Sequence, residues 1–522
     1  MKRKTALFLA LVLIASALLA ACGNTGESAN ASTTAASNGG AATQATDTQA
    51  GDSTARDSIV THIETDVASF DPNLSVALVD GTVQSQIYDT LFFLTRDQQL
   101  LPRIATEYEG SDDGLTYVFH LRDDVLFHNG DKLTAEDVVF SILRSKDSPN
   151  LMIFVEDVES AVALDDYTVE VKMKQPGAQF ITYMCSIFIV NKKVVEELGD
   201  DYPNNPVGCG PYKLEKHEPA YQVTLTRFDE YYRGPARIKT AIFRVMTDLN
   251  AATIAIQAGD IDIGDIASSS YANIESDPNL KIETFESLRI DYFIPNNNAY
   301  PFDNKLVRQA VSYAIDRQLV IDTAMDGFGI PTSAMIARAV VGYSDKIQQK
   351  YYYDVEKAKA LLAEAGIQTP LDIGVIKCFD SHKIDVQVMQ QALAEIGLNA
   401  TIEVMELNKL VEELSAGNFV FAAIGISLYA DADSYSMIFN NGSTYNFAGC
   451  NNPEIEALFA QGRVENDLAK RQEIYTKIYG IADEEAIYVP GYYRTSIYAY
   501  DKDLTVDYFD ARYQRIYDMH WN

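Results

Sequence analysis

Apolar side chains alternate with polar or smaller ones along residues 115–121, and this period of two places the larger apolar groups on one face of a strand. A second short apolar run follows, and it leads to Asn129-Gly130, a pair that readily takes the positive φ angles of a tight turn. The pattern therefore predicts a half-buried strand and, after it, a turn. The apolar face of this strand is predicted to consist of Leu115, Tyr117, Phe119 and Leu121.

A helix is predicted directly after this turn. Thr134 can accept a hydrogen bond from an amide of the first helical turn while Asp137 reaches back to Thr134, which is the reciprocal arrangement of a capping box. The apolar residues beyond the cap recur at helical spacing and form a stripe that would face a core. This stripe consists of Val138, Val139, Ile142 and Leu143.

The later part of the chain alternates predicted helices and strands. Residues 355–366 carry alanine and leucine at helical spacing and end in Gly366, a residue typical of helix C-termini. A strand-like run at 371–379 follows, then a helix at 386–397 and another strand at 398–406. Strands joined through helices favour a parallel sheet covered by helices, so we expect this part to be α/β.

An apolar strand is predicted to end abruptly at Ala430-Asp431-Ala432-Asp433. Because the carboxyl ends of strands in open α/β sheets face the ligand crevice, the two aspartates are candidate ligand-binding residues. A half-buried carboxylate is costly unless a cation meets it, so Asp431 would favour a charged amine over a neutral group. The structural alternative is that Asp431 or Asp433 caps the N-terminus of a helix.

The N-terminus has the pattern of a lipoprotein signal. Three basic residues precede an apolar run at residues 6–19, and small residues then lead to Cys22. The run is shorter than the roughly 20 residues of a membrane-spanning helix, which is the alternative interpretation. We therefore expect residues 1–21 to be a signal peptide and Cys22 to carry lipid chains, of which two suffice for a stable anchor.

Residues 22–57 are predicted to form a disordered tether, because Ala, Thr, Ser, Gly and Asn dominate and almost nothing in them could be buried. About 35 such residues have a coil reach of roughly 30 to 35 Å. Roughly 460 residues remain, and 47% of the whole chain is hydrophobic. That is too large for a single ordinary domain, so we expect two lobes.

Charge and cysteine content narrow the class of partner. The 74 acidic and 42 basic residues give a net charge of -32, which disfavours nucleic acid and anionic lipid as partners and keeps the protein soluble.

The histidines and cysteines give no sign of a metal site. His120 and His128 flank the predicted turn, but two histidines without a third donor do not define a metal site, and we interpret them as solvated strand positions. Apolar or turn-like surroundings favour single buried thiols at the remaining cysteines, which are Cys185, Cys209, Cys378 and Cys450.

An ordered set of segments resembles one protein family. Residues 105–144 are similar to the segment near the start of the family 5 extracellular solute-binding proteins, the dipeptide and oligopeptide binders of ABC importers. The resemblance spans nearly everything after about residue 58, and it rests on the order of the segments rather than on a single motif. Further segments that resemble the family lie at 206–212, 257–262, 302–317, 452–455 and 471–479.

The resemblance implies an α/β, two-lobed fold like that of the type II periplasmic binding proteins, with an extra subdomain in lobe one. Residues 58–72 are predicted from their own pattern to form a strand that enters at a sheet edge and a loop, and the resemblance implies that this loop lines the cleft. The hinge strands would lie near Tyr292 and Val489. The implied limits are 59–287 and 491–522 for lobe one, about 90–205 for its subdomain and 288–490 for lobe two.

The resemblance also implies where a ligand would bind. In peptide-binding relatives an aspartate pairs with the ammonium group of the ligand, and by position this role falls here to Asp431, beside Tyr429 and Asp433. The chain departs from the family pattern in this segment. Leu428 stands where the family has tryptophan, and Ser434 stands near its usual proline.

Three further residues are candidates for ligand contact. Arg338 lies near the position at which some dipeptide-binding relatives keep a carboxylate-clamping arginine, and a planar guanidinium suits that chemistry. His62 and Ser69 lie in the loop that would line the cleft. No cofactor or metal site is expected.

The function implied is that of a monomeric, lipid-anchored binding protein on the extracytoplasmic face of the cell membrane. It would capture peptides between its lobes and deliver them to a permease, while partner subunits hydrolyse ATP; the chain has no GxxxxGK[ST] loop of its own. The same fold could instead bind a nickel chelate, an opine or an oligosaccharide, or serve a signalling pathway. A secreted hydrolase with a carboxyl pair is the alternative of another class, although HExxH and GxSxG are absent.

Overall fold

The computed structural model describes residues 56–75, 77–347, 349–443, 445–508 and 513–522. The predicted signal peptide, Cys22 and the tether up to residue 55 lie outside them. Arg56 and Asp57, which the sequence placed in the tether, already contact the fold. Arg56 forms an ion pair with Asp262, and the carbonyl of Asp57 accepts hydrogen bonds from the amides of Lys239 and Thr240. Among the described helices, none is long and apolar enough to cross a membrane.

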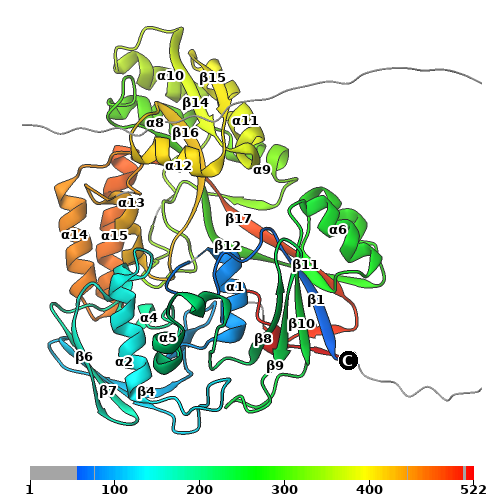
Figure 1. The fold of residues 1–522 in the computed structure, drawn as a ribbon. Coiled ribbons are helices and arrows are strands. Elements are labelled where there is room, and N and C mark those ends of the chain that lie inside the picture. Colours follow the sequence, from blue (N-terminus) through cyan, green and yellow to red (C-terminus); the bar gives the residue numbers. More distant parts are fainter. Residues whose placement is uncertain (1–55, 76, 348, 444, 509–512) are drawn as a thin grey trace, which may run out of the picture. The chain divides into compact units, whose positions relative to one another are not determined.

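One sheet of eleven strands runs through the compact unit that the described residues form. Its order is β15-β14-β16-β12-β17-β11-β1-β10-β9-β8, and β13 pairs with β17. The two longest strands, β12 and β17, lie side by side in the middle and join the two halves of the sheet (Figure 1). The strands are β1 (Ser58–Ile63), β8 (Tyr212–Glu218), β9 (Gln222–Arg227), β10 (Thr240–Val245), β11 (Ile263–Asp265), β12 (Leu280–Pro295), β13 (Gly329–Pro331), β14 (Leu371–Cys378), β15 (Leu398–Val404), β16 (Phe421–Ser427) and β17 (Val489–Asp501).

The first half of the sheet is built around β1. This strand pairs in parallel with β10 on one side and with β11 on the other, so the prediction that it lies at a sheet edge is wrong. Four of its six residues are buried, as expected for a strand covered on both faces. The other elements of this half are α1 (Leu78–Ile87), α6 (Leu249–Ala258), η3 (Ser268–Ser270), α7 (Tyr271–Glu275), β18 (Leu504–Val506), η6 (Ile516–Asp518) and β19 (Met519–Trp521).

A four-stranded antiparallel sheet, ordered β4-β5-β7-β6, carries the first predicted strand. Tyr117, Phe119 and Leu121 of β5 are buried, which confirms the strand and most of its apolar face. Thr134 and Asp137 form the predicted capping box at the start of α2. The elements around this sheet, which we call the subdomain, are β2 (Phe92–Leu94), β3 (Leu100–Pro102), β4 (Ala105–Gly110), β5 (Thr116–Leu121), α2 (Ala135–Arg144), η1 (Ser145–Asp147), α3 (Met152–Val155), β6 (Val158–Asp165), β7 (Thr168–Met173), α4 (Phe180–Tyr183), α5 (Lys192–Leu198) and η2 (Gly199–Asn204).

The second half of the main sheet confirms the predicted α/β alternation. β14 pairs in parallel with both β15 and β16. Ala422 and Ile424 of β16 belong to one buried core and Phe421 and Ala423 to another, so both faces of this strand are covered. The helices are α8 (Lys305–Ala314), α9 (Arg317–Ala324), α10 (Val355–Glu364), η4 (Asp380–His382), α11 (Lys383–Glu395), α12 (Leu407–Ser415), η5 (Ala432–Tyr435), α13 (Ser436–Phe439), α14 (Pro453–Val464) and α15 (Leu468–Glu485).

The pairing of β12 with β17 is irregular at two places, and the longer interruption lies between Glu286 and Ile290. The register is continuous up to Glu286 and resumes at Ile290, so the residues between them have no regular partner on β17. There the hydroxyl of Ser287 donates to the carbonyl oxygen of Arg494 at 3.0 Å. β12 and β17 contain the positions at which the hinge was predicted, while the lobe limits themselves stay a prediction.

Candidate functional site

A cavity of about 550 Å³ lies where the irregular part of β12 faces β17. Residues of both strands form part of its wall, namely Phe285 and Ser287 to Arg289 of β12 and Arg494 to Tyr498 of β17. Glu64 and Asp265 contribute from the carboxyl ends of β1 and β11, and residues 427–429 contribute from that of β16. Ligands bind at the carboxyl ends of strands in open α/β sheets, and the volume suits a small ligand, so this cavity is the candidate binding site.

A smaller cavity of about 90 Å³ adjoins the first, and Leu288, Tyr429 and Tyr513 line both. The ring of Tyr429 also packs edge-on against Phe154 of the subdomain, with 4.4 Å between the ring centroids. Tyr429 is therefore placed where a ligand could reach it, and its contact with a ligand stays a prediction.

Arg494 lines the large cavity, and across the described ranges its guanidinium forms no ion pair and no hydrogen bond. The two carboxylates behind it each have another partner, although one oxygen of Asp291 has none among the described residues. Asp291 accepts hydrogen bonds from Arg289, and Asp385 accepts one from the hydroxyl of Tyr492 at 3.1 Å. Since a guanidinium offers five N–H donors in a planar fork that fits a carboxylate, Arg494 is a candidate anion-binding group.

Asp265, at the end of β11, is a carboxyl group of unusual acidity. Burial raises the pKa of Asp265 to about 7, and the negative charge of Glu64 adds to the rise. A hydrogen bond with Tyr498 and the positive charge of Arg494 act in the opposite direction. No cation of the described chain lies within ion-pair distance of Asp265, so a cationic ligand group would stabilise its ionised form.

Arg289 is held in the wall of the cavity by a buried partner. Its guanidinium donates to Asp291 at 2.8 and 3.0 Å, and Nε2 of His382 lies 2.7 Å from the same oxygen. Burial alone would raise the pKa of Asp291, but Arg289 and His382 outweigh it and lower this pKa. The guanidinium crosses Gly425 of β16 so closely that no Cβ fits there, which explains the glycine.

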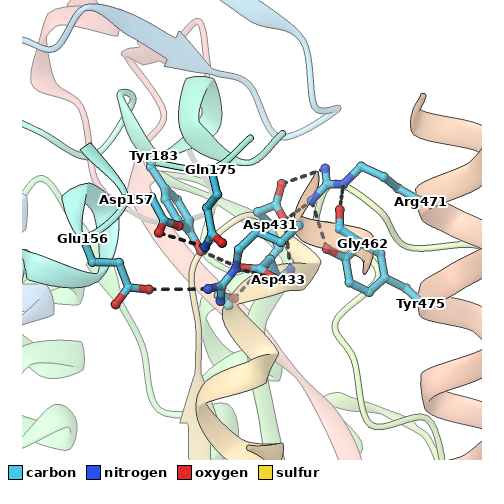
Figure 2. A network of polar contacts seen from close by, with 11 residues as sticks. Glu156, Asp157, Gln175, Tyr183, Asp431, Asp433, Gly462, Arg471 and Tyr475 are labelled. Atoms are coloured by element: carbon cyan, nitrogen blue, oxygen red, sulfur yellow. Dashed lines mark hydrogen bonds and ion pairs between the residues drawn. The ribbon is translucent and has the colours of Figure 1, made fainter. Parts of the chain in front are cut away.

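Asp431, the principal predicted ligand residue, lies outside the cavity. It is fully buried, and Arg471 of α15 donates to both of its carboxylate oxygens, at 2.8 and 3.2 Å (Figure 2). Arg471 also donates to the hydroxyl of Tyr475 and to the carbonyl of Gly462. Asp431 accepts from the amide of Asp433 as the N-cap of η5, which is the structural alternative raised from the sequence. The negative charge of Asp431 is thus already balanced by Arg471 inside the protein.

Asp433 lies between the second half and the subdomain. Nε of Arg463 from α14 lies 3.1 Å from its carboxylate, and the hydroxyl of Tyr183 from α4 lies 3.5 Å away. Arg463 also pairs with Glu156 of the subdomain, 3.6 Å away, which brings the groups of Figure 2 together. Burial raises the pKa of Asp433 to about 6, against the lowering effect of Arg463. Asp433 therefore lies in an internal contact and not in the cavity wall.

Arg338 also lies away from the cavity. Its guanidinium pairs with Glu286 and lies 5.1 Å from the centroid of the Tyr493 ring. The Arg338 side chain is 41% exposed and lines a shallow surface pocket together with Arg96 and Gln98. The structure therefore does not bring Arg338 and Asp431 together around one ligand-sized space.

His62 and Ser69 are buried residues that support the fold near the cavity. Nε2 of His62 lies 3.0 Å from the carbonyl oxygen of Asp265, its ring lies against Gly264, and burial lowers its pKa. The hydroxyl of Ser69 accepts from the amide of Asp71. Neither side chain lines the cavity, so their ligand contacts stay predictions.

Two interpretations of single residues have clear outcomes. Cys185, Cys209, Cys378 and Cys450 are all free thiols, which confirms the preference for unpaired cysteines. The interpretation of His128 as a solvated strand position is wrong, because its ring packs on the turn before β8. It accepts from the amide of Gly208, and burial lowers its pKa to about 3. Within the described ranges, no three His, Cys, Asp or Glu side chains gather as a metal site would require.

Sequence reasoning missed Asp265, Arg289 and Arg494, which together with Glu64 are the charged residues that line the cavity. Asp265 was detectable in principle, because it ends the short apolar strand β11, whereas Arg289 lies in a strand with several other charged residues and gave no such signal. Asp265 is also the last residue of β11, which pairs in parallel with β1, so the strand-end rule applies to it as well as to β16. What the sequence lacked was the pairing that brings the three strands together.

Comparison with known proteins agrees with this architecture. Residues 99–447 match the family described as bacterial extracellular solute-binding proteins, family 5 Middle. The oligopeptide-binding protein OppA of Bacillus subtilis (strain 168) is 26% identical over 541 residues, or 95% of each chain. The glutathione-binding protein GsiB of Escherichia coli O1:K1 / APEC is 25% identical over 474 residues, or 86% of this chain and 92% of that one.

A solved structure shows the same fold over the full length of its chain. The ABC transporter substrate binding protein CtaP of Listeria monocytogenes aligns with a TM-score of 0.83 at 28% identity. The alignment covers 90% of this chain and 99% of CtaP. With the family match over residues 99–447, this chain belongs to the bacterial extracellular solute-binding proteins of family 5 and has their two-lobed type II periplasmic-binding-protein fold.

Proposed function

We propose that this solute-binding protein captures short peptides in the 550 Å³ cavity and delivers them to the permease of an ABC importer. The observation that carries the proposal is the mixed lining of the cavity by both halves of the sheet. Apolar side chains such as Leu288 and Leu428 alternate there with hydroxyl groups such as Ser287 and Ser427. Such a lining suits a peptide, which combines polar backbone groups with side chains of both kinds. The names of OppA and GsiB support the same ligand class.

Capture would work by a shift between open and closed states. Both halves contribute to the cavity wall, so a bound peptide would contact both and favour the arrangement in which they are close. β12 and β17 are the strands about which the halves would move. The closed state would dock on the permease, and ATP hydrolysis would take place in partner subunits.

The chain would act on the outer face of the cell membrane. A lipidated Cys22 would anchor it, and residues 22–55 would serve as a tether that lets the binding unit reach the permease. We expect a monomer, because one chain supplies both halves of the cavity.

A hydrolase is the rival function, and one observation favours testing it. Glu64 and Asp265 both line the cavity, and a carboxyl group with a pKa near 7 is suited to general acid catalysis. We favour binding because the family consists of solute-binding proteins. Turnover of a peptide or glycoside by purified protein, lost in the Asp265→Asn variant, would establish the hydrolase instead.

Native mass spectrometry tests the proposed function directly. The chain from residue 23 onward would be purified from cells, and its spectrum recorded before and after denaturing release of bound molecules. A set of short peptide masses is the expected result. Protein that carries no peptide, binds none from a defined mixture and instead retains a nickel chelate, an opine or an oligosaccharide would show another ligand class in the same fold.

A further inference from the structure

We propose that the cavity recognises both charged ends of a short peptide, with the carboxylate at Arg494 and the ammonium group at Asp265. This inference rests on the proposed peptide ligand and deepens it. It assigns the two ends to residues of this chain, and it predicts a limit on ligand length.

The binding site for the peptide carboxylate is inferred from Arg494, whose guanidinium has no partner among the described residues. Its guanidinium lines the cavity without a hydrogen-bonding partner among the described residues, and its five donors would otherwise face solvent. Asp291 and Asp385 lie behind it, but one oxygen of Asp291 already accepts from Arg289 and faces His382, Asp385 accepts from Tyr492, and Arg494 forms no ion pair with either carboxylate among the described residues. A carboxylate that enters the cavity therefore meets an available cation, and the hydroxyl groups of Ser287 and Ser427 line the same space.

The binding site for the peptide ammonium group is inferred from the charges and hydrogen bonds around Asp265. Its carboxyl group receives a hydrogen bond from Tyr498, and no lysine or arginine of the described chain forms an ion pair with it. Glu64 lines the same part of the cavity and adds a second negative charge. An ammonium group placed between Asp265 and Glu64 would relieve the repulsion between the two carboxylates, which gives a cation an electrostatic reason to bind there.

The distance between Asp265 and Arg494 along the sheet sets the length of peptide that can reach both residues. Asp265 pairs directly with Tyr498, and Tyr498 lies four positions beyond Arg494 on β17, on the same face of the strand. Four strand positions span roughly 13 Å. An extended peptide advances about 3.5 Å per residue, so the two charges match the ends of a peptide of about two to four residues.

The predicted pair of Asp431 and Arg338 cannot serve this role as it stands. Asp431 is neutralised by Arg471 and fully buried, while Arg338 pairs with Glu286 on another surface. Moving either residue to a ligand would first break an existing ion pair. Asp265 and Arg494 need no such rearrangement.

The test uses peptides whose ends are blocked one at a time. Mixed-sequence peptides of two to eight residues, each with free ends, with an acetylated N-terminus or with an amidated C-terminus, would be titrated into the protein by calorimetry. The wild-type protein is expected to bind free peptides of two to four residues at least about tenfold more tightly than either blocked form, because each block removes one charge pair. Longer peptides are expected to bind more weakly.

Two variants assign the ends. In Arg494→Gln, amidation of the C-terminus should no longer weaken binding, whereas acetylation still should. In Asp265→Asn, acetylation of the N-terminus should no longer weaken binding, whereas amidation of the C-terminus still should. Arg338→Gln is the matched control, since it removes an arginine outside the cavity, and it should behave like the wild type. Thermal melting of each variant would verify its folding.

Each outcome decides between the two proposals. Tight binding of free peptides that is unaffected by both blocks would refute the assignment of the ends and leave peptide capture intact. Failure of all peptides, together with retention of another solute, would refute both. Because the blocked peptides are compared on the wild-type protein, the assignment of charged ends remains testable even if a variant does not fold.

Discussion

Asp431 and Arg471 form an ion pair from which solvent is excluded, and each partner depends on the other. The two hydrogen bonds between them, with those from Arg471 to Tyr475 and Gly462, satisfy both charged groups inside the protein. Desolvation of two charges roughly cancels their attraction, so the pair adds little net stability. A single unpaired charge at this place would be costly. The pair therefore fixes the chain before α13 and leaves ligand recognition to other residues.

Loss of Arg471 should destabilise the protein strongly. Arg471→Met leaves the carboxylate of Asp431 buried without a cation, and we expect the free energy of unfolding to fall by about 3–5 kcal/mol. Urea denaturation followed by circular dichroism measures this change. Arg338→Gln removes a partly exposed ion pair and should cost about 1 kcal/mol or less. Equal losses in the two variants would contradict the role assigned to the buried pair.

Peptide affinity should depend on pH through Asp265. With a pKa of about 7, Asp265 loses its charge as the pH falls below 7, and affinity should then fall about tenfold per pH unit. Above roughly pH 8 the peptide ammonium group itself loses its proton, so affinity should peak near pH 7 to 8. Calorimetry with a free tripeptide from pH 5 to 9 measures both limbs. The acid limb should vanish in Asp265→Asn, and its persistence there would point to another group.

At the same scale, the sequence showed which residue types could bind but not which were already engaged. The segment 471–479 was recognised as part of the family resemblance, yet nothing in it indicated that Arg471 reaches Asp431, 40 positions earlier. Similarly, Arg494 stands among aromatic residues that suggest only packing. Whether a charge is free depends on partners distant in sequence, and only the fold supplies them.

At the scale of elements, local signals were reliable and long-range pairing was not. The capping box at Thr134, the strand at β5 and the parallel pair β14 and β15 depend on neighbouring residues or on short connections. The position of β1 in the sheet interior depends on β10 and β11, which lie nearly two hundred residues away in the chain. For the same reason the irregularity opposite Arg494, which helps to form the cavity, could not be predicted.

Contact between α14 and the subdomain should depend on Arg463. This residue pairs with Asp433 and Glu156, and its carbonyl accepts from the amide of Ala178. In Arg463→Gln the two side-chain pairs weaken, and we expect faster hydrogen exchange in α3 and α4 than in the wild type. Exchange mass spectrometry measures this. Lys192→Gln, which breaks an exposed pair with Glu136, is the control and should leave both helices unchanged.

At the scale of the whole molecule, the anchor should decide where the protein is found. Lipidation of Cys22 would hold the chain at the membrane, because two or more acyl chains bind a bilayer stably. Cys22→Ser should therefore release the protein into the soluble extracytoplasmic fraction without changing peptide affinity. Fractionation after labelling with a fatty-acid analogue measures lipidation and release, and calorimetry measures the peptide affinity. Membrane retention of the variant would mean that another part of the chain holds it there.

Because β12 and β17 run side by side, they would form the axis about which the two halves rotate, and this affects how different parts of a ligand act on closure. In a rotation, displacement grows with distance from the axis, and Arg494 lies on one of the two strands that would serve as that axis. A ligand group bound to Arg494 would thus make nearly the same contacts in the open and closed states. It would therefore contribute to affinity but would hardly shift the equilibrium towards the closed state. Tyr429, which packs on Phe154 of the subdomain, and the contact of Arg463 with Glu156 lie on neither of these two strands, so the rotation would displace them more. One part of a ligand would then set its residence time, and another part would set whether the protein closes.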